Sequence, residues 1–290
     1  MAGLSGWDFA VVFAKAIAYA ATLASAGSIF FLAYSRALLR NPQSVRIRRW
    51  TLILLITSAI ASMAAIPLLA GSMSGDFSGM FDRANAVMIL HAGAGRATGF
   101  RVAGLALALF GVSDQRRFQA PAILGAIVAA TSFSWAGHAH ALLPNIVPSL
   151  LLCLHLVCAA FWLGALAPLL IVAQGSRAAQ IAAAASRFGR LAVAAVALLV
   201  IAGLGLLWIL IGDASTFWNS GYGRLVALKL LTVAILLSAA ALNKLHLTPR
   251  LLNGDEGAAR LFRRSLKAEM ILAGVILLIT AAFTTVTGPP

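Results

Sequence analysis

Charged residues are scarce in this chain. Only 10% of its 290 residues are Asp, Glu, Lys or Arg, against 61% hydrophobic residues, and the mean hydropathy is +0.95. An ordinary soluble domain carries about 25% charged residues, so this composition excludes one. The apolar residues fall in blocks of about twenty or more, the length that an α-helix needs to cross a bilayer. We therefore predict an all-α, polytopic membrane helix bundle.

The chain also lacks the usual residues of disulfide scaffolds and hydrolytic enzymes. Its two cysteines, Cys153 and Cys158, lie on one predicted helix, beyond disulfide reach of each other, so both are expected to be free thiols. It has 8 acidic residues and neither a Gly-x-Ser-x-Gly nor a His-Glu-x-x-His motif. The glycine-rich stretch GAGRATG (93–99) follows no predicted strand, which argues against a phosphate-binding loop. We expect the protein not to be an enzyme.

The apolar blocks predict eight transmembrane helices joined by short polar connections, which leave no room for a soluble domain. We therefore treat residues 1–290 as a single integral membrane domain. The N-terminal stretch MAGLSGWDFAVV has no basic residue before its apolar part, so we expect a first spanning helix rather than a cleaved signal peptide. The predicted spans are 9–36, 50–71, 86–112, 119–142, 148–172, 188–211, 223–245 and 265–286.

Basic residues outnumber acidic ones by 22 to 8, and their positions indicate an orientation. Alternate connections between spans hold one basic residue, Arg83. Because Lys and Arg gather in cytoplasmic loops, the other connections are expected to face the cytoplasm and both termini the periplasm of a bacterial inner membrane. The net charge of +14 is then a consequence of topology and does not indicate nucleic-acid binding. The basic connections are 36–50, 113–118, 174–190 and 244–267.

Two histidines are predicted to lie at one depth in neighbouring helices. His138 would lie about 9 Å below the outer end of its span and His155 about 10 Å below the outer end of the next. The short connection LLPNIVPS (142–149) makes these two spans antiparallel neighbours. We therefore predict a periplasmic-side metal site with His138 and His155 as ligands. His140 points about 200° away from His138 on a regular helix, so it joins the site only if the helix is distorted; His91 is a further candidate near the outer side.

Soft sulfur ligands lie near the same side of the predicted bundle. Met73, Met80 and Met88 fall in the outer loop or beside it, and Cys158 lies one turn below His155. Thioethers and thiolates select Cu(I), and imidazole binds either oxidation state of copper, so these residues are possible accessory copper ligands. The alternatives stay open: histidines that only hydrogen-bond neighbouring helices, in an assembly or scaffold protein, and sulfur side chains that only pack.

Several charged side chains fall inside the predicted spans. Lys229 would lie about 9 Å below the outer end of its helix, near the depth of the histidine pair, and Lys15 and Arg101 are further candidates to line the site. Burying such charges costs several kcal/mol unless they snorkel or find a partner. Positive charges suit a cofactor with carboxylate arms, so haem b is an alternative, with His138 and His155 as axial ligands. Glu269 is expected to pair with a basic neighbour.

Two long segments of the second half carry a resemblance to a known family. RFGRLAVAAVALLVIAGLGLLWILIG (187–212) and GYGRLVALKLLTVAILLSAAALNKLHLTPRL (221–251) resemble the copper resistance protein D (CopD) family, with residues 183–286 the most similar part. LHLVCAAFWLGALAPL (154–169) and GHA (137–139) resemble its middle section, and KAIAYAATLASAGSIFF (15–31) and GRATGFR (95–101) its first half. The matching pattern residues are Phe188, Gly189, Arg190, Gly203, Tyr222, Gly223, Lys229, Asn243 and Pro249.

The resemblance implies an inner-membrane protein of eight spans that handles copper. Members are usually interpreted as moving copper inward from a periplasmic copper-binding partner of the CopC type. His138 and His155 match the family's membrane histidines. Unlike some relatives, this sequence has no fused periplasmic copper-binding domain, so such a partner would be a separate chain.

Overall fold

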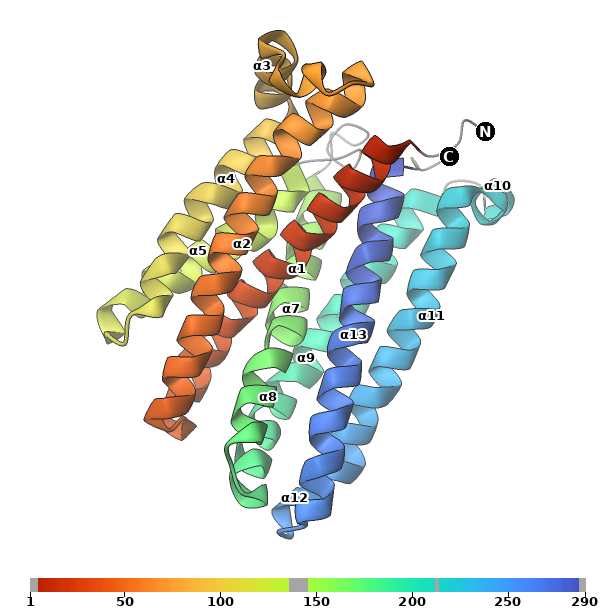
Figure 1. The fold of residues 1–290 in the computed structure, drawn as a ribbon. Coiled ribbons are helices and arrows are strands. Elements are labelled where there is room, and N and C mark those ends of the chain that lie inside the picture. The colour runs from red at the N-terminus through yellow and green to blue at the C-terminus, as the bar shows by residue number, and fades with distance from the viewer. Residues whose placement is uncertain (1–4, 136–145, 212–213, 287–290) are drawn as a thin grey trace.

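The computed structural model describes residues 5–135, 146–211 and 214–286, and all regular structure in these ranges is helical (Figure 1). The longer helices run side by side in one bundle (Figure 1). The first half contains α1 (Gly6–Ser35), α2 (Asn41–Ser74), α3 (Arg83–His91), α4 (Gly93–Ala108) and α5 (Gln119–Thr131), with short 3₁₀ turns η1 (Arg36–Leu38), η2 (Ser78–Phe81), η3 (Leu109–Val112), η4 (Arg116–Phe118) and η5 (Ser132–Trp135). The second half contains α7 (Ile146–Gly164), α8 (Leu166–Gln174), α9 (Ala178–Ile211), α10 (Ala214–Asn219), α11 (Gly221–Leu242), the π-helix η6 (Asn243–Leu247), α12 (Thr248–Leu252) and α13 (Glu256–Val286).

Seven helical segments within the described residues are long and apolar enough to span a membrane, and they overlap seven of the eight predicted spans. The remaining one, 86–112, is broken at Ala92, whose extended backbone (φ −74°, ψ 173°) separates α3 from α4. The helical segment that follows the break, α4 with η3, is not among the seven. The eighth crossing therefore stays a prediction, whereas the multi-pass, all-helical architecture is confirmed.

Helix α1 lies at the centre of the bundle and packs on α2, α5, α7 and α13. Its contact with α7 brings two glycines together. A Cβ added to Gly27 would lie 2.0 Å from the carbonyl oxygen of Ala160 and 2.5 Å from the Cα of Gly164. Small residues at such a crossing let two backbones approach closely, which is the usual source of helix association inside a membrane. This crossing joins the two halves of the chain.

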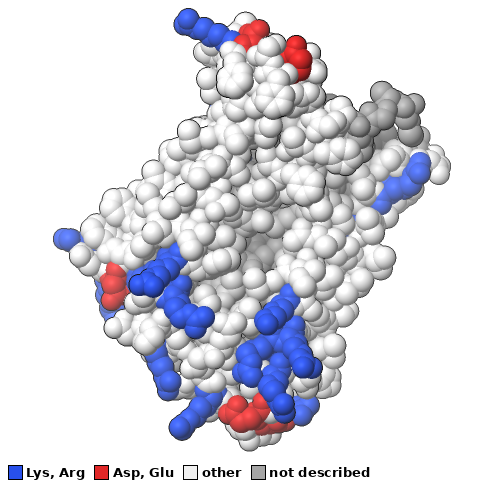
Figure 2. Space-filling model, viewed as in Figure 1, with Lys and Arg blue, Asp and Glu red and all other residues white. Residues whose placement is uncertain are grey.

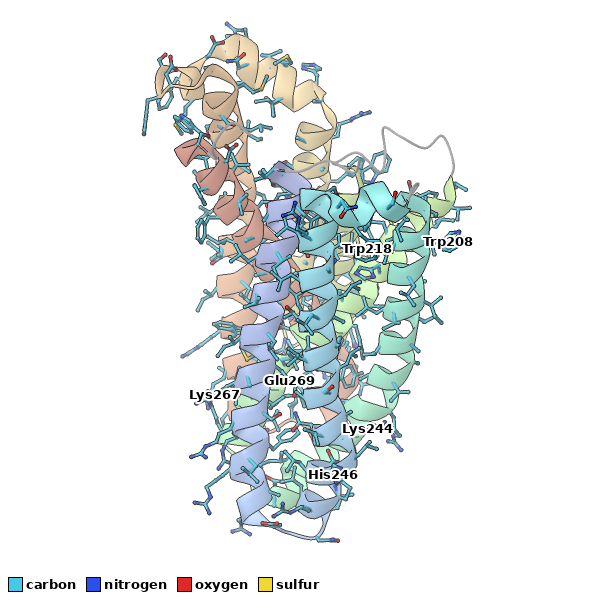
Figure 3. All side chains as sticks on the ribbon, turned by 90° about the vertical axis from the view of Figure 1, so that its right-hand side faces the viewer. Trp208, Trp218, Lys244, His246, Lys267 and Glu269 are labelled. Atoms are coloured by element: carbon cyan, nitrogen blue, oxygen red, sulfur yellow. The ribbon has the colours of Figure 1, made fainter. Side chains whose placement is uncertain are left out.

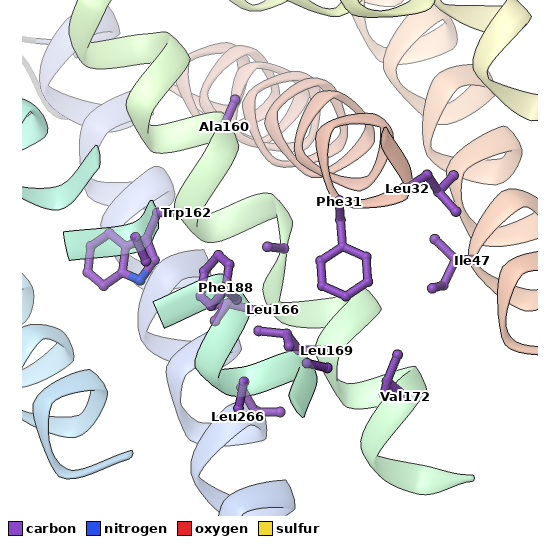
Figure 4. Close-up of a cluster of buried hydrophobic side chains, with 14 of the residues drawn as sticks. Phe31, Leu32, Ile47, Ala160, Trp162, Leu166, Leu169, Val172, Phe188 and Leu266 are labelled. Atoms are coloured by element: carbon purple, nitrogen blue, oxygen red, sulfur yellow. The ribbon is translucent and has the colours of Figure 1, made fainter. Parts of the chain in front are cut away.

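The main apolar core lies around the lower parts of α1, α7, α8 and α9 (Figure 4). Phe31 of α1 and Leu166 of α8 are among its largest fully buried side chains, and Leu169 and Phe188 pack with them. A smaller cluster of Phe217, Tyr222, Val226, Ile279 and Phe283 joins α11 to α13 near the other end.

Lys and Arg gather at one end of the molecule, which we call the basic end (Figure 2). Asp114 forms ion pairs with Arg36 and Arg48 there, and Asp255 pairs with Arg250. Helix α1 begins and α13 ends at the opposite end (Figure 1). The clustering fits the expected orientation, but the side of the membrane that each end faces stays a prediction.

Candidate functional site

Two of the four predicted histidine ligands, His138 and His140, lie outside the described residues. The predicted pairing of His138 with His155 therefore stays a prediction. His155 itself is on α7 and is half-buried.

His155 is held by the backbone of α9. Its Nδ1 lies 3.0 Å from the carbonyl oxygen of Leu199. A carbonyl oxygen only accepts hydrogen bonds, so Nδ1 must carry the hydrogen and donate it. In the neutral ring this leaves Nε2 with a free lone pair. A ring nitrogen that donates to a backbone carbonyl while the other is left to coordinate is the usual arrangement of metal-binding histidines.

A glycine of α9 makes room for this ring. A Cβ added to Gly203 would lie 3.1 Å from Cε1 of His155 and 3.2 Å from its Nδ1. Gly203 is four residues after Leu199, so the ring lies against the turn of α9 whose carbonyl it contacts. In the sequence, Gly203 was notable only as a residue of the family pattern. The structure shows that its missing side chain leaves space for the ring of His155.

Helix α7 presents different residues to its two neighbours. Cys153 donates a hydrogen bond from Sγ to Oγ of Ser134 in η5, at 3.4 Å. His155 is two residues further along, which places it about 200° round the helix axis. The face of α7 that contacts η5 thus carries Cys153, and His155 points toward α9. Helices α5 and α7 are neighbours, as the short connection predicted.

Of the predicted intramembrane cations, Lys229 is the one whose charge acts on His155. It is on α11, and its Nζ lies 5.3 Å from the ring centre of Phe283 in α13. This contact is a cation–π interaction, which partly compensates the loss of hydration of the ammonium group. The surroundings of His155 therefore include the positive charge of Lys229 on α11.

Arg101 and Lys15 belong to another part of the bundle. Arg101 is 6% exposed and donates from Nε to the hydroxyl of Ser132, at 3.0 Å, and from Nη1 to that of Ser62, at 3.2 Å. Its Cζ lies 3.6 Å from the ring centre of Phe133. Arg101 thus ties α4 to α2 and to η5, the turn that leads toward residues 136–145.

Lys15 joins α1 to the end of α13. Its Nζ donates to the carbonyl of Thr284, at 3.0 Å, and to the hydroxyl of Thr285, at 3.3 Å. The charge of Arg101 also acts on it. Because these acceptors are neutral, Lys15 and Arg101 leave this region with excess positive charge.

His91 and two of the candidate methionines are largely exposed near the end opposite the basic end. His91, at the end of α3, has Nδ1 at 2.8 Å from the carbonyl of Val87 in its own helix. Met73 and Met88 are 53% and 50% exposed, while Met80 packs beside Gly71 and Trp7. Cys158 is buried in the main core, and both cysteines are free, as expected. Within the ranges that the structure describes, no group of three His, Cys, Asp or Glu side chains is placed to hold a metal ion.

A short acidic turn fixes the loop that carries Met80. The carboxylate of Asp76 accepts hydrogen bonds from the backbone N–H of Gly79, at 2.8 Å, and the hydroxyl of Ser78, at 3.0 Å. These bonds favour the charged form and lower the pKa of Asp76, the Gly79 bond most strongly. The turn is thus held by an ionised carboxylate at neutral pH.

Comparison with known families covers most of the chain. The family model for copper resistance protein D matches residues 182–283, which include Gly203 and Lys229. The model for the N-terminal domain of copper resistance protein D-like proteins matches residues 6–143. No curated protein and no solved structure matches the chain. The two family matches and the membrane-spanning helices agree, and the chain belongs to the copper resistance protein D family.

Proposed function

We propose that this protein binds copper through His155 and carries it across the inner membrane, from the periplasm toward the cytoplasm. The observation that carries this proposal is the arrangement of the His155 ring, with Nδ1 donating to the Leu199 carbonyl and Nε2 left to coordinate. Membership in the copper resistance protein D family indicates that the metal is copper. The function is binding and transport, and no catalytic reaction is proposed.

The clustering of basic residues supports the direction (Figure 2). If the basic end faces the cytoplasm, the segment with His91, Met73, Met80 and Met88 faces the periplasm. Thioethers there would take copper from a separate CopC-type protein and pass it inward. His138 would complete the site with His155, and His140 and Cys158 are further candidate ligands.

Electrostatics work against a bare cation in this bundle. Lys229 acts on His155, and Lys15 and Arg101 have neutral hydrogen-bond partners. Electrostatic attraction by carboxylates therefore does not hold copper here. Coordinate bonds from imidazole and sulfur ligands must hold it. The same positive charge motivated the haem b alternative, in which Arg101 and Lys229 would bind propionates. Arg101 instead hydrogen-bonds Ser132 and Ser62, so we favour copper.

Metal analysis and an absorption spectrum of one purified sample test this proposal. We expect bound copper in a stoichiometric amount and no Soret band. A Soret band would establish the haem alternative in place of copper. A colourless protein that binds no copper would support a scaffold protein whose histidines only stabilise packing.

Copper binding is expected to tighten as pH rises through the range in which the imidazole ligands lose their protons. A protonated imidazole carries hydrogen on both nitrogens and has no lone pair for a metal, so acid must release copper. Copper affinity measured by competition with a chelator over a pH series checks this. A copper affinity of the wild-type protein that does not change with pH contradicts an imidazole site.

A further inference from the structure

A buried carboxyl group lies inside the bundle, away from the proposed copper site. Glu269 is on α13 and is 2% exposed, the only buried acidic residue among the described residues. The expected pairing with a basic neighbour is wrong, because none of the ion pairs in the described part of the chain involves it. Lys267, two residues earlier, lies on the other side of α13 (Figure 3). Burying an unpaired carboxylate in this way costs far more free energy than burying a neutral carboxyl.

The partners of Glu269 are neutral. Its Oε1 accepts hydrogen bonds from the Nδ2 amide of Asn243 and, at 3.4 Å, from the hydroxyl of Ser265. Its Oε2 makes no hydrogen bond within the described residues. Asn243 is itself 7% exposed, and its buried Oδ1 has no hydrogen-bond partner in the described part of the chain. Asn243 Oδ1 therefore lacks a donor, and an ionised Glu269 would lack a counter-ion among the described residues.

A proton on Glu269 resolves both mismatches. An ionised carboxylate only accepts hydrogen bonds, so it leaves Asn243 Oδ1 without a donor and a charge without a counter-ion. A carboxylic acid adds one O–H donor. With the amide N–H already donating to Oε1, that O–H is the donor that Asn243 Oδ1 lacks.

The local backbone also departs from the ordinary helix at this point. Asn243 begins the π-helix η6, and its carbonyl accepts a hydrogen bond from the hydroxyl of Thr248, at 2.9 Å. Single π-turns inside α-helices occur frequently at functional sites, where they reposition a side chain. Here the distortion coincides with the residue that contacts Glu269.

A cavity gives this pair a route to the surroundings. It has a volume of about 530 Å³ and lies between α9, α11 and α13, with Glu269, Asn243, Thr248 and Lys244 as its polar lining. Lys244, labelled with Glu269 in Figure 3, is the only other charged residue among the described residues that line the cavity, and its ammonium donates to the carbonyl of Gly189 at 2.9 Å. The lining from α7 and α8 is Trp162, Leu166 and Leu169, which do not titrate.

We infer that Glu269 and Asn243 form a proton-binding site, in which the Glu269 carboxyl takes up and releases a proton through this cavity. On release, the O–H bond of the carboxyl breaks, the proton leaves through the cavity, and Asn243 Oδ1 loses its donor. Two oxygen donors suit a hard cation and do not select Cu(I), so this site is distinct from the copper site. The inference goes beyond copper binding and does not depend on it.

Infrared difference spectra of the full-length protein, recorded between acid and alkaline pH, test the inference. We expect the C=O stretching band of a protonated carboxylic acid, lost on alkaline titration and completely absent in Glu269→Gln. Glu256→Gln is the matched control, since Glu256 is exposed at the start of the same helix. Asn243→Ala should keep the band but shift its frequency, because the hydrogen bonds to the carboxyl change.

Three outcomes would overturn the inference. They are a wild-type protein with no such band at any pH, a band that survives in Glu269→Gln, and a band removed at fixed pH by sodium but not by choline, which would mean a metal-cation site. The His155→Ala protein should give the wild-type band whether or not it binds copper. Failure of the copper proposal and failure of this inference are thus distinguishable.

Discussion

Replacing His155 by alanine is expected to remove the proposed copper site. The purified variant should therefore lose the copper binding that the wild-type protein shows. The imidazole supplies the ligand nitrogen, and alanine has nothing to replace it. The lost bond to Leu199 is worth only about 0.5–1.5 kcal/mol, so the variant should still fold. Copper content and thermal unfolding measured on the same sample separate the two effects. His246→Ala is the control, since His246 is exposed near the basic end (Figure 3).

A substitution that leaves the ligand intact gives a sharper test of the same geometry. Gly203→Val should weaken copper binding by about 10–100-fold, the usual cost of disturbing a residue that orients a metal-binding histidine. The new Cβ alone would lie 3.1 Å from Cε1 of His155, and the added methyl groups leave the ring no room against Leu199. Gly203→Ala should give a smaller loss, because the ring then needs to move by only a few tenths of an ångström.

Gly205→Val is the matched control for Gly203→Val. It lies on the same helix, and a Cβ there would meet Cδ1 of Leu151 at 3.3 Å, the end of a flexible side chain that can move. We expect near wild-type copper affinity for it. Equal copper affinity in the Gly203→Val, Gly205→Val and wild-type proteins would mean that the position of the His155 ring does not matter, and the proposed role of His155 would then fail. Wild-type copper content in His155→Ala would have the same meaning.

The sequence allowed the membrane spans to be predicted because their signal is local. A run of about twenty apolar residues is a property of the run itself. The break at Ala92 was harder to foresee, since the sequence there has no proline, and the close approach of Gly93 to the carbonyl of Trp135 comes from a distant part of the chain. The neighbouring position of α5 and α7 followed from the short connection between them.

The direction of His155 could not be predicted for a specific physical reason. The segment LLLCLHLVCAAFW (150–162) is apolar on every side, so it has no amphipathic pattern that would fix the rotation of the helix. Only the packing of α7 on α9 and on η5 shows that His155 lies against Gly203 and that Cys153 lies against Ser134. Depth along the helix axis was predictable from residue counting, whereas orientation around it was not.

The Glu269 and Asn243 pair was missed for a related reason. The two residues are 26 positions apart and on different helices, so no spacing motif connects them. One signal was present: Glu269 is an acidic residue at the start of an apolar run, where a carboxylate is costly. That cost indicates that some partner must exist but does not identify it, and a basic partner was the wrong choice.

Adding a single methyl group at Gly164, in the variant Gly164→Ala, is expected to cause a large loss of stability. A Cβ there would lie 2.4 Å from the carbonyl oxygen of Leu23 and 2.7 Å from the Cα of Gly27. Overpacking usually costs about 1–3 kcal/mol, with neighbouring side chains absorbing part of the strain. Here the obstructing atoms are backbone, so α1 and α7 must separate, and we expect a cost at or above the upper end of that range.

Gly274→Ala provides the comparison, because Gly274 lies in the middle of α13 with nothing within 4 Å of an added Cβ. Alanine favours the helix over glycine by about 1 kcal/mol, so this variant should unfold at the wild-type temperature or slightly above it. Thermal unfolding in detergent, followed by circular dichroism, measures both. If Gly164→Ala unfolds no earlier than Gly274→Ala, the backbones of α1 and α7 are not in close contact at this crossing. Gly27 lies on the α1 side of the same crossing, and a Cβ there would meet the carbonyl oxygen of Ala160. Gly27→Ala should therefore lower the unfolding temperature as Gly164→Ala does.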